Sequence, residues 1–148
     1  MGAVAYENDF YGWALDQADL LRNAAFGKLD ITNLVEELQA MSARERRELI
    51  SRLRVLLMHL LKWKLQPNYP IKSSWETTIN NQRDDIALLL EDSPSLNTKI
   101  PEALIKAYPM AVREAMQESG LPKSLFPANC PWSYEQIMDN DFWPEPAE

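Results

Sequence analysis

The chain has few cysteines, histidines and glycines, the residues that form disulfides, many metal and nucleophilic sites, and phosphate-binding loops. Its 148 residues include one cysteine, one histidine and four glycines. The single cysteine, Cys130, excludes an intramolecular disulfide, and no HxxxH or ExxH pair accompanies the single histidine, His59. A metal site would therefore need several carboxylates. The glycine-rich phosphate-binding motifs GxGxxG and GxxxxGK are also missing, so we predict no metal, no cofactor and no catalytic residue.

Long apolar runs are missing as well. The longest strongly apolar run, Val55 to Leu61, contains His59 and is far shorter than the roughly 20 residues that cross a membrane. The opening residues MGAVAYENDF hold neither a basic stretch nor an apolar one, so nothing in them predicts export. With a formal charge of -7, the composition predicts an acidic, soluble, cytoplasmic protein and disfavours nucleic acid or an anionic membrane as its general partner.

Apolar residues recur at helical spacing along most of the chain, and no segment alternates as a strand does. We predict six helices, over residues 9–25, 31–41, 43–65, 74–91, 101–119 and a short stretch after residue 133. The short connections between them predict an all-α, single-domain helical bundle that covers residues 1–148.

Local signals predict where these helices begin and end. Three capping boxes begin helices, namely SARE at 42–45, SSWE at 73–76 and SYEQ at 133–136. Asn8 and Asp30 are the predicted caps of the first two helices. Gly120 is the predicted stop of the fifth helix, and Pro109 inside that helix should kink it.

The third predicted helix, residues 43–65, is apolar nearly all round over its middle. Its apolar stripe consists of Leu49, Leu53, Leu56, Leu57, Leu60 and Trp63. A helix of this kind lies at the centre of a bundle, so we expect the other helices to pack around it. The tail, residues 121–148, is acidic and aromatic near its end, and we expect Trp132 and Trp143 to pack it onto the bundle.

The candidate site is a cluster around His59, which lies at the edge of that stripe. Burial would lower the pKa of the imidazole unless a carboxylate is close, and an unpaired buried polar group costs about 1–3 kcal/mol. Partners are available beside the apolar faces of the neighbouring helices, in Glu37, Gln82 and Arg83. The favoured interpretation is a polar network that fixes helix register. The alternatives are a ligand pocket with apolar walls and, third, a metal site.

Several segments together resemble one family. They are DFYGWALDQADLLRNAAFGKLDITNLVEEL, RRELISRLRVLLMHLLKW, SWETTINNQR, LLEDSPSL and SGLPKSLFPANCPWSYEQIMDNDFWP. Over about residues 6–145 the chain is similar to the bacterial family called domain of unknown function 29. The resemblance implies a small all-helical bacterial protein and transfers no activity. It marks as family-like positions Glu37, His59, Trp63, Trp75 and Arg83, whereas Pro101 and Pro109 stand where we expect the family to prefer ordinary helix formers.

Three functions remain open at this point. The first is a non-enzymatic binding or assembly module, whose partner is another protein or a second copy of the chain. The second is an enzyme or small-ligand binder that uses Glu37, His59, Gln82 and Arg83, with His59 carrying a proton. The third, which the acidic charge disfavours, is a nucleic-acid-associated protein that uses a basic surface of Arg44, Arg46 and Arg47.

Overall fold

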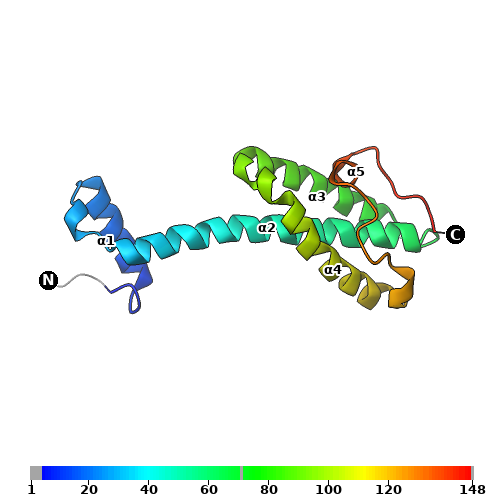
Figure 1. Cartoon of the computed structure of the whole chain (residues 1–148), viewed down its shortest axis with the longest axis horizontal. Helices are drawn as coiled ribbons and strands as arrows, with labels where there is room; N and C mark the ends of the chain where they lie inside the picture. The colour runs from blue at the N-terminus through cyan, green and yellow to red at the C-terminus, as the bar shows by residue number, and fades with distance from the viewer. Residues whose placement is uncertain (1–4, 71, 148) are drawn as a thin grey trace. The chain divides into compact units, whose positions relative to one another are not determined.

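The computed structural model describes residues 5–70 and 72–147, and within these ranges every regular element is a helix. The elements in chain order are α1 (Phe10–Arg22), η1 (Phe26–Lys28), α2 (Ile31–Leu65), α3 (Lys72–Asp92), η2 (Pro94–Lys99), α4 (Ile100–Ser119), η3 (Lys123–Leu125) and α5 (Tyr134–Met138), where η marks a 3-10 helix (Figure 1). The predicted all-α fold is confirmed, with five α-helices in the described residues instead of six.

The contacts divide the chain into two compact units, Met1–Arg44 and Glu45–Glu148. The first, called the N-terminal unit below, holds α1, η1 and the beginning of α2. The second, the C-terminal unit, holds the rest of α2 and all later elements. The extent of a single domain over residues 1–148 stays a prediction.

The predicted break before residue 43 is wrong, because α2 is one helix from Ile31 to Leu65. Ser42 does not cap a new helix. Its hydroxyl donates a hydrogen bond to the carbonyl oxygen of Leu38, one turn back, at 3.2 Å. A serine whose hydroxyl bonds to its own helix in this way is tolerated inside it. The residues that follow are mostly arginine, glutamate and leucine, which are strong helix formers, so nothing stops the helix there.

Two other predicted helix starts are shifted. Asp9, and not Asn8, caps α1, because its carboxylate accepts a hydrogen bond from the backbone amide of Gly12 at 3.0 Å. Here the sequence offers two adjacent polar residues, and the capping pattern alone does not distinguish them. Ser73, predicted to cap the fourth helix, lies inside α3, which begins at Lys72.

The remaining boundary signals are confirmed. Asp30 caps α2 and accepts hydrogen bonds from both the backbone amide and the side-chain amide of Asn33. Ser133 and Gln136 form a complete capping box at α5. Gly120 ends α4 in the left-handed conformation, with φ of 73°, a backbone geometry that glycine adopts without strain.

The fifth predicted helix is confirmed as α4 despite its two prolines. Pro101 lies in its first turn, where a backbone N–H would have no helical acceptor. Pro109 lies inside the helix, which continues past it to Ser119. A 3-10 segment, Pro94–Lys99, leads into α4 and carries the chain over from α3.

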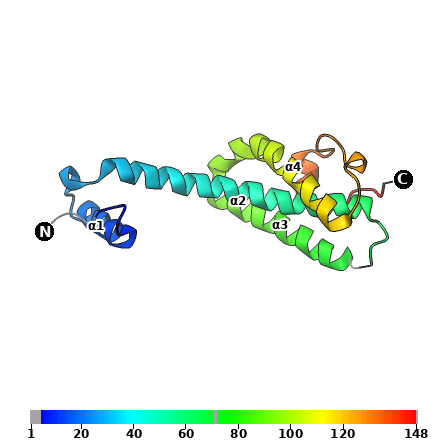
Figure 2. The ribbon, with the colours of Figure 1, turned by 90° about the horizontal axis from the view of Figure 1, so that it is seen from below.

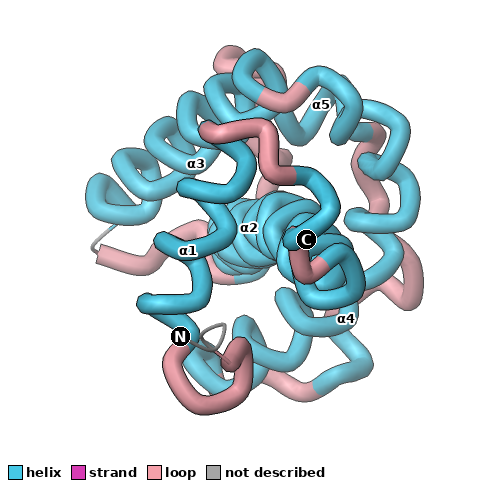
Figure 3. The backbone as a smooth tube through the Cα atoms, turned by 90° about the vertical axis from the view of Figure 1, so that its left-hand side faces the viewer, coloured by secondary structure: helices cyan, strands magenta, loops and turns pink. Residues whose placement is uncertain are grey.

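The core lies in the C-terminal unit, where the second half of α2 runs between α3 and α4 (Figures 2 and 3). Its fully buried side chains are Leu49, Leu53, Leu56, Leu57, Leu60 and Leu61. They pack with Ile79 and Ile86 of α3, with Ile137 of α5, and with a row of small residues on α4. That row consists of Ala103, Ala107, Ala111 and Ala115, all buried at four-residue spacing. The predicted central helix is therefore confirmed as this half of α2.

The continuity of α2 has a test in two matched substitutions. Ser42→Ala should leave stability unchanged or raise it by about 0.5 kcal/mol, because alanine is the better residue inside a helix. Ser133→Ala should lower stability by about 1 kcal/mol, because Ser133 is a true N-cap. Urea unfolding followed by far-UV circular dichroism measures both. A loss of about 1 kcal/mol in Ser42→Ala would mean that a helix does begin there.

Candidate functional site

His59 lies half-buried on α2, and its own helix satisfies it. The Nδ1 atom lies 2.8 Å from the carbonyl oxygen of Val55, which can only accept, so Nδ1 carries the proton and donates. Burial lowers the pKa of the imidazole below its ordinary 6.5, the bond to Val55 raises it, the charge of Lys62 lowers it and that of Glu118 raises it. The net lowered pKa favours a neutral ring whose Nε2 is an acceptor.

Glu37 lies in the N-terminal unit, where its carboxylate accepts a hydrogen bond from the hydroxyl of Tyr6. This bond, assisted by burial and by nearby acidic charge, raises the pKa of Tyr6 to about 12. Tyr6 also packs edge-on against Trp13, with ring centroids 4.7 Å apart. Glu37 therefore holds the segment before α1 against α2, and sequence analysis missed Tyr6 because no helical pattern includes it.

Arg83 of α3 is the most deeply buried charged residue in the described part of the chain, with 1% of its surface exposed. Its Nε donates to the carbonyl oxygen of Ile137 and its Nη2 to that of Phe142, both at 2.8 Å. The guanidinium also lies over the ring of Trp143, 5.3 Å from its centroid. Burial lowers the pKa of Arg83, and the charge of Asp139 raises it. Arg83 thus fixes the chain after α5 onto α3.

Gln82, next to Arg83, has a different environment. Its side chain is half-buried, and its Oε1 atom is buried without a hydrogen-bond partner among the described residues. The Nη1 atom of Arg83 is in the same state. Of the four residues predicted to form one cluster, Glu37, His59 and Arg83 each have a partner set of their own. A shared ligand pocket at these four residues stays a prediction.

Trp63 and Trp75, predicted as family-like positions and counted with the candidate cluster, take part in cation–π contacts. The ammonium group of Lys72 lies 4.0 Å from the ring centroid of Trp63, which in turn packs against Trp143 at 4.6 Å. Aromatic rings attract a cation placed over their face, and the attraction grows as water is excluded. Trp63 and Trp143 also pack against the core cluster, and Lys72 covers the ring of Trp63.

Trp75 is buried, and its ring forms a cation–π contact with Lys62, a residue that the sequence analysis did not predict for the site. Lys62, only 7% exposed, lies 4.7 Å over the ring of Trp75 and forms an ion pair with Glu118 of α4. The ring of Tyr69 stacks on Trp75 at 4.7 Å. A signal was present in the sequence, because Lys62 is the one charged residue in the apolar stretch of residues 55–63. A cation there needs a partner.

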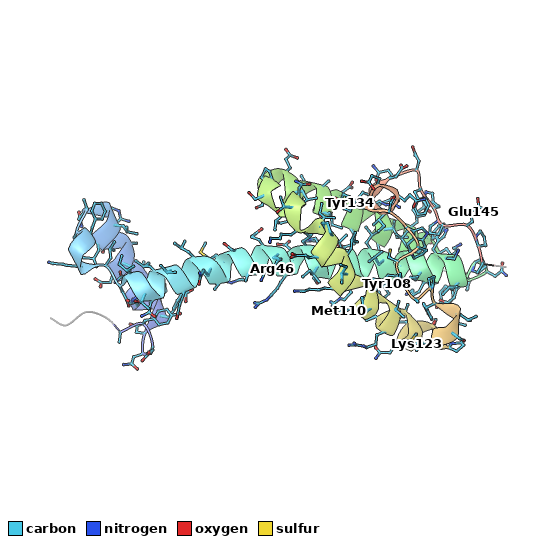
Figure 4. All side chains as sticks on the ribbon, viewed as in Figure 1. Arg46, Tyr108, Met110, Lys123, Tyr134 and Glu145 are labelled. Atoms are coloured by element: carbon cyan, nitrogen blue, oxygen red, sulfur yellow. The ribbon has the colours of Figure 1, made fainter. Side chains whose placement is uncertain are left out.

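The predicted basic surface is exposed. Arg44, Arg46 and Arg47 all lie open to solvent on α2, and Figure 4 labels Arg46. The two later arginines of the same stretch differ, because each joins α2 to a neighbouring helix. Arg52 pairs with Asp85 of α3 at 3.0 Å, and Arg54 with Glu114 of α4 at 3.2 Å.

Two clefts flank Tyr108 of α4, where residues from the segment 123–130 line them from the other side. Figure 4 labels Tyr108. Their volumes are about 370 and 320 Å³, and their walls are largely apolar. The hydroxyl of Tyr108 donates to the carbonyl oxygen of Pro127 at 2.6 Å, and burial raises the pKa of Tyr108 to about 12. No pattern in the sequence indicated these clefts.

In residues 5–70 and 72–147, no group of three or more His, Cys, Asp or Glu is placed to hold a metal ion. Within the same residues, no helix has the length and apolar character that a membrane crossing requires.

In the residues that the structure describes, this is an all-α protein, and α2 lies at the centre of its C-terminal unit. A comparison with protein families matches residues 5–143 to the family described as domain of unknown function DUF29. The chain belongs to this family, and the resemblance stated from the sequence is confirmed. Comparisons with curated proteins and with solved structures gave no match.

The lowered pKa of His59 predicts a pH dependence of stability. Because the pKa of His59 is lower in the folded chain than in the unfolded one, the unfolded chain binds a proton more readily. The contribution of His59 to the free energy of unfolding is therefore highest above about pH 6.5, the pKa expected in the unfolded chain, and decreases as the pH falls below that value. The slope cannot exceed about 1.4 kcal/mol per pH unit, the value for one proton. Urea unfolding between pH 5 and 8 should show a shallower dependence in His59→Asn than in the original chain.

The same titration has a direct reading by NMR, because His59 is the only histidine and its imidazole signals need no assignment. The pKa of His59 measured in this way should lie below 6.5. A measured pKa at or above that value, or an identical pH dependence of stability in His59→Asn, would contradict the burial of a neutral imidazole.

Proposed function

We propose that the chain is a non-enzymatic helical binding or assembly module, and that its N-terminal unit is the part that binds. The observation that carries this proposal is the exposure of large apolar side chains in that unit. They are Phe10, Tyr11, Leu15, Leu21, Phe26, Ile31, Val35, Leu38 and Met41. Single exposed apolar residues are ordinary, but nine within about 30 residues are typical of a surface that another molecule covers.

The interior of the N-terminal unit is small by comparison. Among its described residues only Trp13 and Gln17 are buried. Both side chains bond to Asp30, because the indole N–H of Trp13 donates to its carboxylate and the Gln17 carbonyl accepts from its backbone amide. These polar contacts fix α1 against the beginning of α2. They leave most of the apolar surface of both helices outside.

The polar residues of the candidate cluster also support a module without chemistry. Arg83 donates to two main-chain carbonyls, His59 donates to its own helix, and Glu37 accepts from a tyrosine hydroxyl. The bonds of Arg83 and Glu37 each hold one segment on another, and the bond of His59 satisfies its ring within α2. In this proposal Glu37, His59 and Arg83 stabilise the fold of their own units, and the exposed apolar residues of the N-terminal unit bind the partner.

Site-specific photocrosslinking in living cells tests this function. A photoreactive phenylalanine analogue replaces Leu38, which is 62% exposed, and in a matched strain it replaces Glu36, an exposed residue on the opposite side of the same helix. The module predicts a discrete protein adduct from position 38 and only background from position 36. Equal yields from the two positions, or no protein adduct from 38, contradict it.

A further inference from the structure

One apolar stripe runs along both halves of α2. In the C-terminal unit its members Leu49, Leu53, Leu56 and Leu60 are completely buried. Steps of three and four residues towards the N-terminus pass two polar positions, Glu45 and Ser42, and then reach the apolar residues Leu38, Val35 and Ile31 on the same side of the helix. The last three are 62%, 46% and 58% exposed. Alternating steps of three and four are the spacing with which a helix packs along another helix. Half of this stripe is covered, and the other half is uncovered.

The N-terminal unit lacks the usual means of stabilising a small fold. Folds below about 40 residues usually need a disulfide, a metal or association with another chain, and this unit, Met1–Arg44, is close to that limit. The only cysteine, Cys130, lies in the other unit. The described residues also hold no cluster suited to a metal ion. Association is the remaining means.

We infer that the occupant of this face is the N-terminal unit of a second copy of the chain, an inference that rests on the proposed function. Two hairpins, each made of α1 and the beginning of α2, would pack as four helices around the stripes Ile31, Val35 and Leu38. A two-fold axis suits such a face, because each stripe meets an identical one.

The available area is sufficient for a stable dimer. The nine exposed apolar residues, at on the order of 100 Å² each, offer up to roughly 900 Å² per copy. A standard specific interface buries about 800 Å² per partner. A second copy therefore needs no surface beyond this unit.

Charge does not oppose the pairing of two identical faces. The N-terminal unit is acidic, but the residues that border the stripe on one side, Thr32 and Gln39, are neutral. Glu36 lies two residues from Leu38, about 200° around the helix and away from the stripe. Glu37 is engaged by Tyr6. Like charges are thus kept off the contact, and this arrangement favours a second copy over a basic partner.

Sedimentation equilibrium of the full chain tests the dimer. The inference requires a mass of twice 17.1 kDa at high micromolar concentration. Leu38→Glu and, in a separate variant, Ile31→Glu should weaken the dimer about 100-fold. Either substitution removes one buried apolar side chain from both copies, and the loss of one such side chain weakens binding about tenfold or more. Ile105→Glu is the matched control, since Ile105 is 74% exposed on α4 in the other unit, and it should leave the mass doubled.

The outcomes separate the dimer from the proposed function. A wild-type mass of one chain at all concentrations, or a dimer that survives Leu38→Glu and Ile31→Glu with helical content unchanged, overturns the dimer. A doubled mass that Ile105→Glu abolishes places the contact on α4 and overturns it as well. If the chain is monomeric and position 38 still crosslinks to a different protein, the binding module survives and the second copy is excluded.

Discussion

The apolar stripe of α2 stabilises the fold where it is removed from water, and the two units differ in how much of it they cover. In the C-terminal unit, α3, α4 and α5 cover the stripe, and each leucine buried there contributes about 1.5–3 kcal/mol. The four alanines of α4 leave room for those leucines. In the N-terminal unit Asp30 holds α1 and Glu37 holds the segment before it, but Ile31, Val35 and Leu38 remain exposed. The division of the chain into two units follows from this difference.

A second constraint is the buried guanidinium of Arg83. A buried cation is costly unless it is hydrogen bonded, and the acceptors that it uses belong to the main chain of Ile137 and Phe142. The tail is therefore part of the core and completes it. Trp143, placed by this anchor, packs on Trp63, and Lys72 covers that pair. The aromatic residues near the chain's end thus have a structural role within the C-terminal unit.

The sequence predicted those features that depend on neighbours within one or two helical turns. The central stripe, the caps at Asp30 and Ser133 and the stop at Gly120 are of this kind. The false start at Ser42 shows the limit, because a serine that bonds to its own helix has the same sequence signature as one that caps a new helix. His59 was expected to need a partner from another helix, and the carbonyl of Val55, one turn away, supplies it. Arg83 finds acceptors 54 and 59 residues later, and side-chain patterns do not predict main-chain acceptors. Periodicity likewise identifies an apolar face without showing which half of it is covered.

We propose that association with a second copy, and not the chain alone, buries the first half of the α2 stripe. Amide hydrogen exchange measured at rising protein concentration distinguishes these two cases. The amides of residues 49–63 should be protected at every concentration, whereas those of residues 31–41 should gain protection as the concentration rises. Protection of residues 31–41 that does not change with concentration would contradict it.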